Sequence, residues 1–139
     1  MRLFRFCSPK EIEALLRGAT LKNIKDHCKN GRGGSLSTGF CFTPDPPKTA
    51  FKYLSGIVCP LCCVEYEVPD AVITPSMGVY AKNSDDGTYS KQLKREYYCT
   101  KLSLSLFRLI RIYLPSDYTS KEEFEASLFI YKGRGGRLR

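Results

Sequence analysis

The stretch Arg2-Leu3-Phe4-Arg5-Phe6-Cys7-Ser8-Pro9-Lys10-Glu11 predicts a strand that runs directly into a helix. Its first part is mostly apolar and has the length of a strand. Ser8 then offers an N-cap, Pro9 takes the first helical position, and Glu11 stands where a capping box needs a carboxylate. Apolar residues continue at helical spacing up to Gly18, which ends the helix. The chain therefore begins with one strand and one early helix.

Further elements follow an irregular segment at 20–39. We expect a strand at 40–43, a central helix between Pro46 and Gly56, and a strand at 63–68 with alternating apolar residues. A capping box at 120–123 opens a C-terminal helix. The sequence thus predicts an α+β fold, a single compact domain at 1–132 with a mixed sheet and an early, a central and a C-terminal helix. A basic Gly/Arg tail at 133–139 is expected to be disordered, and 107–114 fits either one bent strand or a strand followed by a helix.

The composition is that of an ordinary folded chain. Of the 139 residues, 42% are hydrophobic and 26% are charged, which argues against disorder and low complexity. No apolar run approaches the ~18 residues that cross a bilayer. The N-terminus has neither the apolar core nor the cleavage site of a secretory signal. We therefore expect a cytoplasmic protein without a membrane partner.

The charge is strongly basic and uneven. The formal net charge is +8 and the pI is near 9.2. Residues 1–56 and 91–139 are net basic, whereas 57–90 are net acidic. A basic face attracts polyanions, so nucleic acid, a nucleoprotein complex or a phosphorylated ligand is the expected partner. The alternative is a solvated surface that serves solubility alone.

Seven cysteines occur without a secretory signal, so we expect no persistent disulfides. Cys59 and Cys62 form a CxxC pair, which is half of a tetrahedral zinc site. The missing ligands would have to come from His27-Cys28 or Cys99. The chain has no second CxxC and no His pair, so zinc is the less favoured interpretation. The favoured one is that Cys59 and Cys63 pack inward at a helix-to-strand junction.

Small and hydroxyl-bearing residues are concentrated at 31–39, Gly-Arg-Gly-Gly-Ser-Leu-Ser-Thr-Gly. This is not a phosphate-binding loop of the Gly-Lys-Ser/Thr type, nor a complete dinucleotide fingerprint. Its backbone N–H groups could still approach a phosphate or ribose, and Ser35 and Ser37 could bond a polar ligand. The same composition also suits a plain loop that enters the strand at 40–43.

Polar residues near strand starts occur in a characteristic order. Arg5 lies in the first strand, Ser37 precedes the strand at 40–43, and Glu96 precedes the β-rich segment at 97–100. This order resembles the ADP-ribosyltransferase family. The stretch 37–43, followed by 48–53, is also similar to a Gly-aromatic-x-aromatic-Thr … Ala-x-x-Tyr pattern in several such enzymes.

The resemblance implies that NAD is a substrate and that Glu96 is catalytic, stabilising the oxocarbenium-like transition state. The family often has a Glu or Gln two residues earlier, where this chain has Lys94. Glu65-Tyr66-Glu67 matches an ExE pattern but comes earlier than expected, so Glu67 is the alternative carboxylate. The residues implied in NAD binding are Arg5 (with Arg2 as the alternative), Ser35, Ser37 and Tyr53.

Two classes of function follow. The first is a small NAD-dependent ADP-ribosyltransferase that acts on a nucleic-acid or nucleoprotein target, such as a phage or mobile-element effector. The second is a non-enzymatic basic protein of the anti-defence type that inhibits or coats a nucleic-acid-binding complex. Cations interleaved with aromatics, including Arg108, Arg111 and Tyr113, suit the gripping of single strands. A zinc-stabilised interaction module ranks third.

Overall fold

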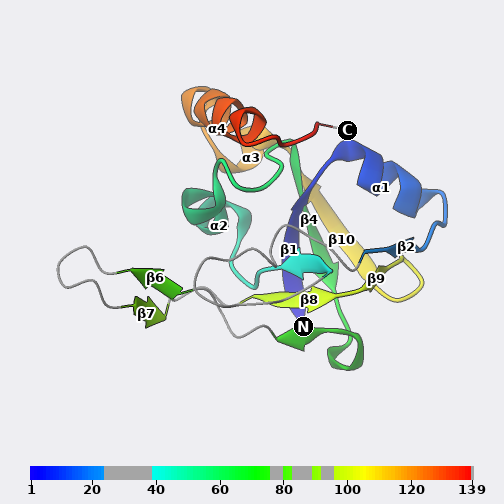
Figure 1. The fold of residues 1–139 in the computed structure, drawn as a ribbon. Helices are drawn as coiled ribbons and strands as arrows, with labels where there is room; N and C mark the ends of the chain where they lie inside the picture. The colour runs from blue at the N-terminus through cyan, green and yellow to red at the C-terminus, as the bar shows by residue number, and fades with distance from the viewer. Residues whose placement is uncertain (24–38, 76–79, 83–88, 92–95, 139) are drawn as a thin grey trace.

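The computed structural model describes residues 1–23, 39–75, 80–82, 89–91 and 96–138 (Figure 1). The elements in chain order are β1 (Arg2–Cys7), α1 (Pro9–Leu16), β2 (Leu21–Lys22), β3 (Phe40–Phe42), α2 (Pro47–Leu54), β4 (Cys62–Glu67), the 3-10 helix η2 (Asp70–Val72), β5 (Thr74–Pro75), β6 (Tyr80–Lys82), β7 (Tyr89–Lys91), β8 (Tyr97–Cys99), β9 (Lys101–Leu102), β10 (Arg108–Tyr113), α3 (Pro115–Tyr118) and α4 (Lys121–Gly133).

The main sheet has the order β1-β4-β10, and both strand pairs are antiparallel. β4 is the middle strand, which explains why only its last residue, Glu67, escapes full burial. Cys7 stands directly opposite Cys62, and Arg2 opposite Glu67. Because side chains alternate along a strand, this register sends two separate sets of residues to the two faces of the sheet.

Each face of the main sheet is covered by its own layer. Leu15 of α1 packs in one cluster with Val64 and Tyr66 of β4. On the other face, Phe6 packs against Phe51 of α2 and Tyr118 of α3, with ring centroids 6.2 and 5.5 Å away. Figure 1 shows β1, β4 and β10 between α1 on one side and α2 on the other. These two clusters form the core.

A second sheet, β3-β8-β5, is joined to the first by a bridge between Phe4 and Thr43. The N–H of Phe4 donates to the Thr43 carbonyl at 2.8 Å, and the N–H of Thr43 donates to the Phe4 carbonyl at 2.9 Å. Phe42, just before the bridge, packs edge-on against Tyr66 with ring centroids 6.0 Å apart. The bridge therefore brings the end of β3 against β1.

The α+β class is confirmed, and so are an early, a central and a C-terminal helix. The expected mixed sheet is wrong: in the described ranges the strands form four small sheets, and all of their pairs are antiparallel. The uncertain segment 107–114 contains a strand, Arg108–Tyr113, and the short helix α3 begins right after it. The N–H groups of Gly135 and Gly136 bond to carbonyls of the last turn of α4, so the start of the expected tail continues the end of this helix.

The two expected capping boxes differ in outcome. At α4, the Ser120 hydroxyl accepts from the Glu123 N–H, and the Glu123 carboxylate accepts from the Ser120 N–H. At α1, the Ser8 hydroxyl accepts from the Glu11 N–H at 3.4 Å, as expected. The Glu11 carboxylate is bound elsewhere, by Arg5. Arg5 on β1 therefore binds the carboxylate that the predicted capping box assigns to the Ser8 N–H.

Candidate active site at the junction of β1, β3 and β8

The candidate site lies where β3 ends and α2 begins. The Asp45 N–H donates to the Thr43 hydroxyl at 3.1 Å, a local turn of the kind that hydroxyl and carboxylate residues form around Pro44. Tyr53 lies near the end of α2. Its hydroxyl donates to the Asp45 carboxylate at 2.5 Å and lies 3.1 Å from the Thr43 hydroxyl. These contacts join Thr43, Asp45 and Tyr53 in one polar cluster.

Tyr53 stays protonated in this cluster. Burial raises the pKa of its hydroxyl well above the usual tyrosine value, and the hydrogen bond to the Asp45 carboxylate raises this pKa further. The negative charges of Asp45 and Glu96 act in the same direction, whereas the bond with Thr43 acts against it. The phenol is therefore a neutral donor among carboxylates.

Glu96 lies next to this cluster. β8 pairs with β3 so that Tyr97 stands opposite Phe42. In an antiparallel pair the next position places Glu96 beside Thr43. One Glu96 carboxylate oxygen, Oε2, is shielded from solvent, and the Glu96 charge reaches Tyr53. The structure therefore brings together two of the residues predicted from the sequence, Tyr53 and Glu96.

Arg5 approaches the same strand from β1, but its guanidinium is already engaged. Its Nε and Nη2 donate to the two carboxylate oxygens of Glu11, each at 2.9 Å, and its Nη1 donates to the Cys41 carbonyl at 3.2 Å. The guanidinium carbon also lies 5.0 Å from the ring centre of Phe40. The Arg5 side chain is only 9% exposed. These contacts tie β1, α1 and β3 to one another.

The alternatives to Arg5 and Glu96 lie elsewhere. Arg2 bonds Glu65 and Glu67 at the exposed end of the main sheet, at 2.8 and 3.1 Å. Glu67 also lies 3.6 Å from the N-terminal amine of Met1. Arg2 and Glu67 thus form a surface ion-pair network on β1 and β4 and take no part in the cluster around Tyr53.

Several expected site residues lie outside the described residues. These are Ser35 and Ser37, together with most of the loop at 31–39, His27 and Cys28. Conversely, Asp45 and Glu11 belong to the site although no sequence pattern had pointed to them there, and Thr43 had entered only as the last residue of the Gly-aromatic-x-aromatic-Thr pattern. The stretch Thr43-Pro44-Asp45 could have predicted this turn, because a hydroxyl and a carboxylate on either side of a proline favour a turn in which a side chain bonds the backbone.

The cysteines are mainly structural. Cys59 and Cys63 are buried, as expected, and the thiols of the described chain are Cys7, Cys59, Cys62, Cys63 and Cys99. Cys41 is disulfide-bonded, so the expectation of no disulfides is wrong for this residue. Among the described side chains, no three His, Cys, Asp or Glu groups converge as metal ligands.

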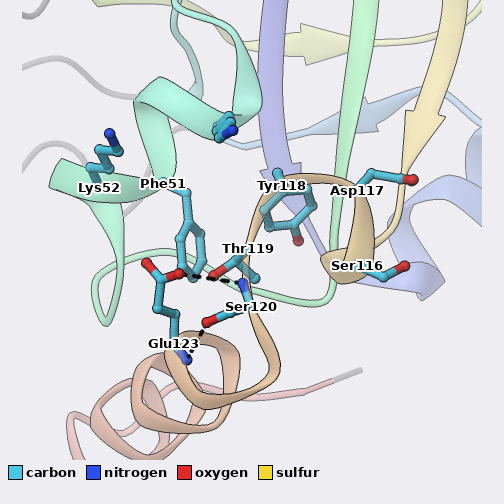
Figure 2. A pocket seen from close by; sticks show the side chains of 9 residues that line it. Phe51, Lys52, Ser116, Asp117, Tyr118, Thr119, Ser120 and Glu123 are labelled. Carbon is cyan, nitrogen blue, oxygen red and sulfur yellow. Dashed lines mark hydrogen bonds between the residues drawn. The ribbon is translucent and has the colours of Figure 1, made fainter.

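A separate pocket lies between α2, α3 and the start of α4 (Figure 2). Its volume is about 290 Å³. Its wall combines the lysines of α2 with the aromatic rings of Phe51 and Tyr118 and the capping residues Ser120 and Glu123, which bond each other's backbone N–H. No sequence pattern indicates this pocket, because its two walls are more than sixty residues apart in the chain.

Comparisons with known proteins add no relative. The chain matches no known protein family, no curated protein and no solved structure. In the part of the chain that the structure describes, no helix is both long and apolar enough to traverse a bilayer. Function must therefore be inferred from the chemistry of the site.

Proposed function

We propose that this protein is a small NAD-dependent ADP-ribosyltransferase that acts on a nucleic-acid or nucleoprotein target. The observation that supports the proposal is the position of Glu96, which directly precedes β8 and whose charge acts on Tyr53. The family resemblance points to Glu96 and Tyr53 in segments more than forty residues apart. Their proximity in the fold is what a shared site requires.

The electrostatics of the cluster suit the reaction. In ADP-ribosyl transfer the bond between C1′ of the ribose and the nicotinamide nitrogen breaks, and nicotinamide leaves with the bonding electrons. A nucleophile of the acceptor then forms a bond to C1′ and releases its proton to water. Positive charge develops on the ribose in between. The carboxylates of Glu96 and Asp45 already lie near the neutral Tyr53 phenol before the reaction, so they would stabilise that positive charge as it develops.

In this proposal Arg5 holds β3 in place and does not contact NAD itself. Its Nε and Nη2 bind Glu11 and its Nη1 binds the Cys41 carbonyl, so it supports β3 next to the cluster. Direct NAD contacts would then fall to Tyr53 and to the hydroxyls of Ser35 and Ser37, the residues that the family resemblance implies. Arg5 is thus proposed as a positioning residue for the site.

The test uses NAD labelled on its adenylate phosphate, offered with single-stranded RNA, DNA and protein acceptors. Glu96→Gln keeps the size of the side chain and removes its charge. We expect it to lower label transfer and nicotinamide release by roughly two to three orders of magnitude. The matched control is Glu67→Gln, which removes a carboxylate bound at the surface by Arg2, and it should stay near the wild-type rate. No NAD consumption by the wild type, or full activity of Glu96→Gln with both variants folded, would overturn the proposal.

The second candidate is a basic binding protein without enzymatic activity. It is favoured by the exposed arginines Arg108 and Arg111 on β10, since neither forms an ion pair within the described residues. If the wild type binds nucleic acid but neither binds nor consumes NAD, this candidate replaces the first. Calorimetry with NAD separates the two, because a pure binder gives no heat with NAD.

A further inference from the structure

On the face of the main sheet that α2 and α3 partly cover, β10 carries two exposed arginines that the proposed chemistry does not use. Arg108 stands opposite Glu67, and Arg111 stands opposite Glu65. Residues three apart on a regular strand point to opposite faces. Here the register shifts between Leu109 and Arg111, so Ile110 is the extra residue of a β-bulge. The bulge brings Arg108 and Arg111 to the same face, which is a recognised use of bulges in aiming side chains.

The carboxylates on this face are already neutralised by other groups. Glu65 accepts from Arg2 Nη1 at 2.8 Å and from the Tyr113 hydroxyl at 2.9 Å. Glu67 accepts from Arg2 Nε at 3.1 Å and lies near the N-terminal amine. Although Glu65 and Glu67 stand opposite Arg111 and Arg108, neither forms an ion pair with them in the described part of the chain. The charges of both β10 arginines therefore remain available to a partner.

Arg111 is also held in a defined orientation. Its guanidinium carbon lies 4.5 Å from the ring centre of Tyr113, which is a cation–π contact. Tyr113 is fixed in turn by its bond to Glu65 and by the ring of Phe4, whose centroid is 6.2 Å away. Arg111 itself is exposed. One side of the guanidinium thus rests on an aromatic ring that is itself braced, and the residue is open to solvent.

We propose that this face, defined by Arg108, Arg111 and Tyr113 and called the arginine face below, binds single-stranded nucleic acid. A base stacks on the guanidinium of Arg111, and Arg108 pairs with a neighbouring phosphate. Nucleobases stack on arginine planes as well as on aromatic rings, and such stacking tolerates any base. An acidic peptide would satisfy the charges but would leave the stacking surface of Arg111 unused, so nucleic acid is the better fit. The inference rests on the proposed function in that the bound strand is its target.

The experiment measures fluorescence anisotropy of a labelled single-stranded oligonucleotide over a salt series, without NAD. Arg111→Ala should weaken binding by about tenfold, the size expected from the loss of one stacked base. Arg111→Lys keeps the charge but removes the plane, so it should weaken binding while leaving the salt slope unchanged. Arg108→Ala should lower the slope of log affinity against log salt by about one.

The matched control is Arg17→Ala. Arg17 is exposed at the end of α1, which packs on the opposite face of the main sheet. It should leave the affinity near wild type. Equal losses in Arg17→Ala and Arg111→Ala would mean that net charge alone binds the strand, and this would overturn the proposal. An acidic peptide that displaces the labelled oligonucleotide at a lower concentration than the unlabelled oligonucleotide does would overturn the proposal in favour of a protein partner.

Failure here is distinguishable from failure of the proposed function. Arg111→Ala should still release nicotinamide from NAD in water at the wild-type rate, because Arg111 contacts Tyr113 and, within the described residues, makes no bond to Thr43, Asp45 or Tyr53. Glu96→Gln should bind the oligonucleotide as the wild type does. Loss of oligonucleotide binding without loss of NAD chemistry thus tests the arginine face alone.

Discussion

Arg5 binds both carboxylate oxygens of Glu11 at 2.9 Å, and the two side chains are only 9% and 12% exposed. This pair joins the first strand to the helix that follows it. Since Arg5 also bonds the Cys41 carbonyl of β3, the pair is a structural connection of the candidate site.

Removing one partner of this pair should be costly. Glu11→Ala leaves a nearly buried guanidinium without its counter-ion, and we expect a loss of about 3–5 kcal/mol in unfolding free energy. Replacing both residues, Arg5→Met with Glu11→Leu, should lose much less, because no unpaired charge remains. Urea unfolding gives both values. Glu13→Ala, an exposed carboxylate on the same helix, serves as the control and should change stability by less than about 0.5 kcal/mol. A Glu11→Ala variant as stable as this control would contradict the prediction.

The outcome at Glu11 shows how far local sequence signals reach. Ser8, Pro9 and the apolar spacing identify the start of α1 correctly, because these effects act within one helical turn. The partner of the Glu11 carboxylate could not be predicted, since Arg5 competes for it only once β1 and α1 have folded together. The same limit applies to Arg108 and Arg111, whose shared face depends on a bulge that arises from pairing with β4. Tyr53 and Glu96 are singled out in the sequence only by the resemblance on which the proposed function rests, while Asp45 emerges only from its contacts with Thr43 and Tyr53.

Tyr53 should make stability depend on alkaline pH. Its pKa is raised in the folded state, chiefly by burial and then by the Asp45 hydrogen bond. The unfolded chain therefore loses this proton at lower pH than the folded chain. The contribution of Tyr53 is fully present below the ordinary tyrosine pKa of about 10 and is lost as the pH rises above it. Tyr53→Phe should lessen the fall in unfolding free energy across this range.

The measurement is denaturant unfolding at a series of alkaline pH values, with tyrosinate absorbance as an independent monitor. Tyr66 and Tyr118 are also buried with raised pKa values, so the variant will retain some of the wild-type effect. Tyr97→Phe, on the half-buried strand β8, is the control. An identical pH dependence in Tyr53→Phe and wild type would contradict the prediction.

The buried thiols should resist modification in the native protein. Burial raises the pKa of Cys59 to about 11 and raises the pKa of Cys63 still further. Thiolates are the reactive form, so both should react slowly with a disulfide reagent near neutral pH. Unfolding should expose them, and the titrated thiol count should rise sharply in denaturant. Fast reaction of Cys59 in the folded protein, identified by mass spectrometry, would contradict this burial.

Gly56 should be far less tolerant of substitution than Gly133. Gly56 has a φ of +81° and its N–H donates to the buried Ser127 hydroxyl at 3.0 Å. A Cβ at Gly56 would lie 2.6 Å from Cγ2 of Ile130, so alanine strains the left-handed backbone and forces the Ile130 side chain to shift. The left-handed backbone alone costs about 1–2 kcal/mol. Gly56→Ala should therefore lower the unfolding free energy by at least that amount.

Gly133, the last residue of α4, is the control. No neighbouring atom lies within 4 Å of the position that an alanine methyl group would take there, so Gly133→Ala should be neutral or stabilising by up to about 1 kcal/mol. Thermal unfolding of both variants decides the matter: equal melting temperatures would mean that α4 does not depend on its contact with Gly56.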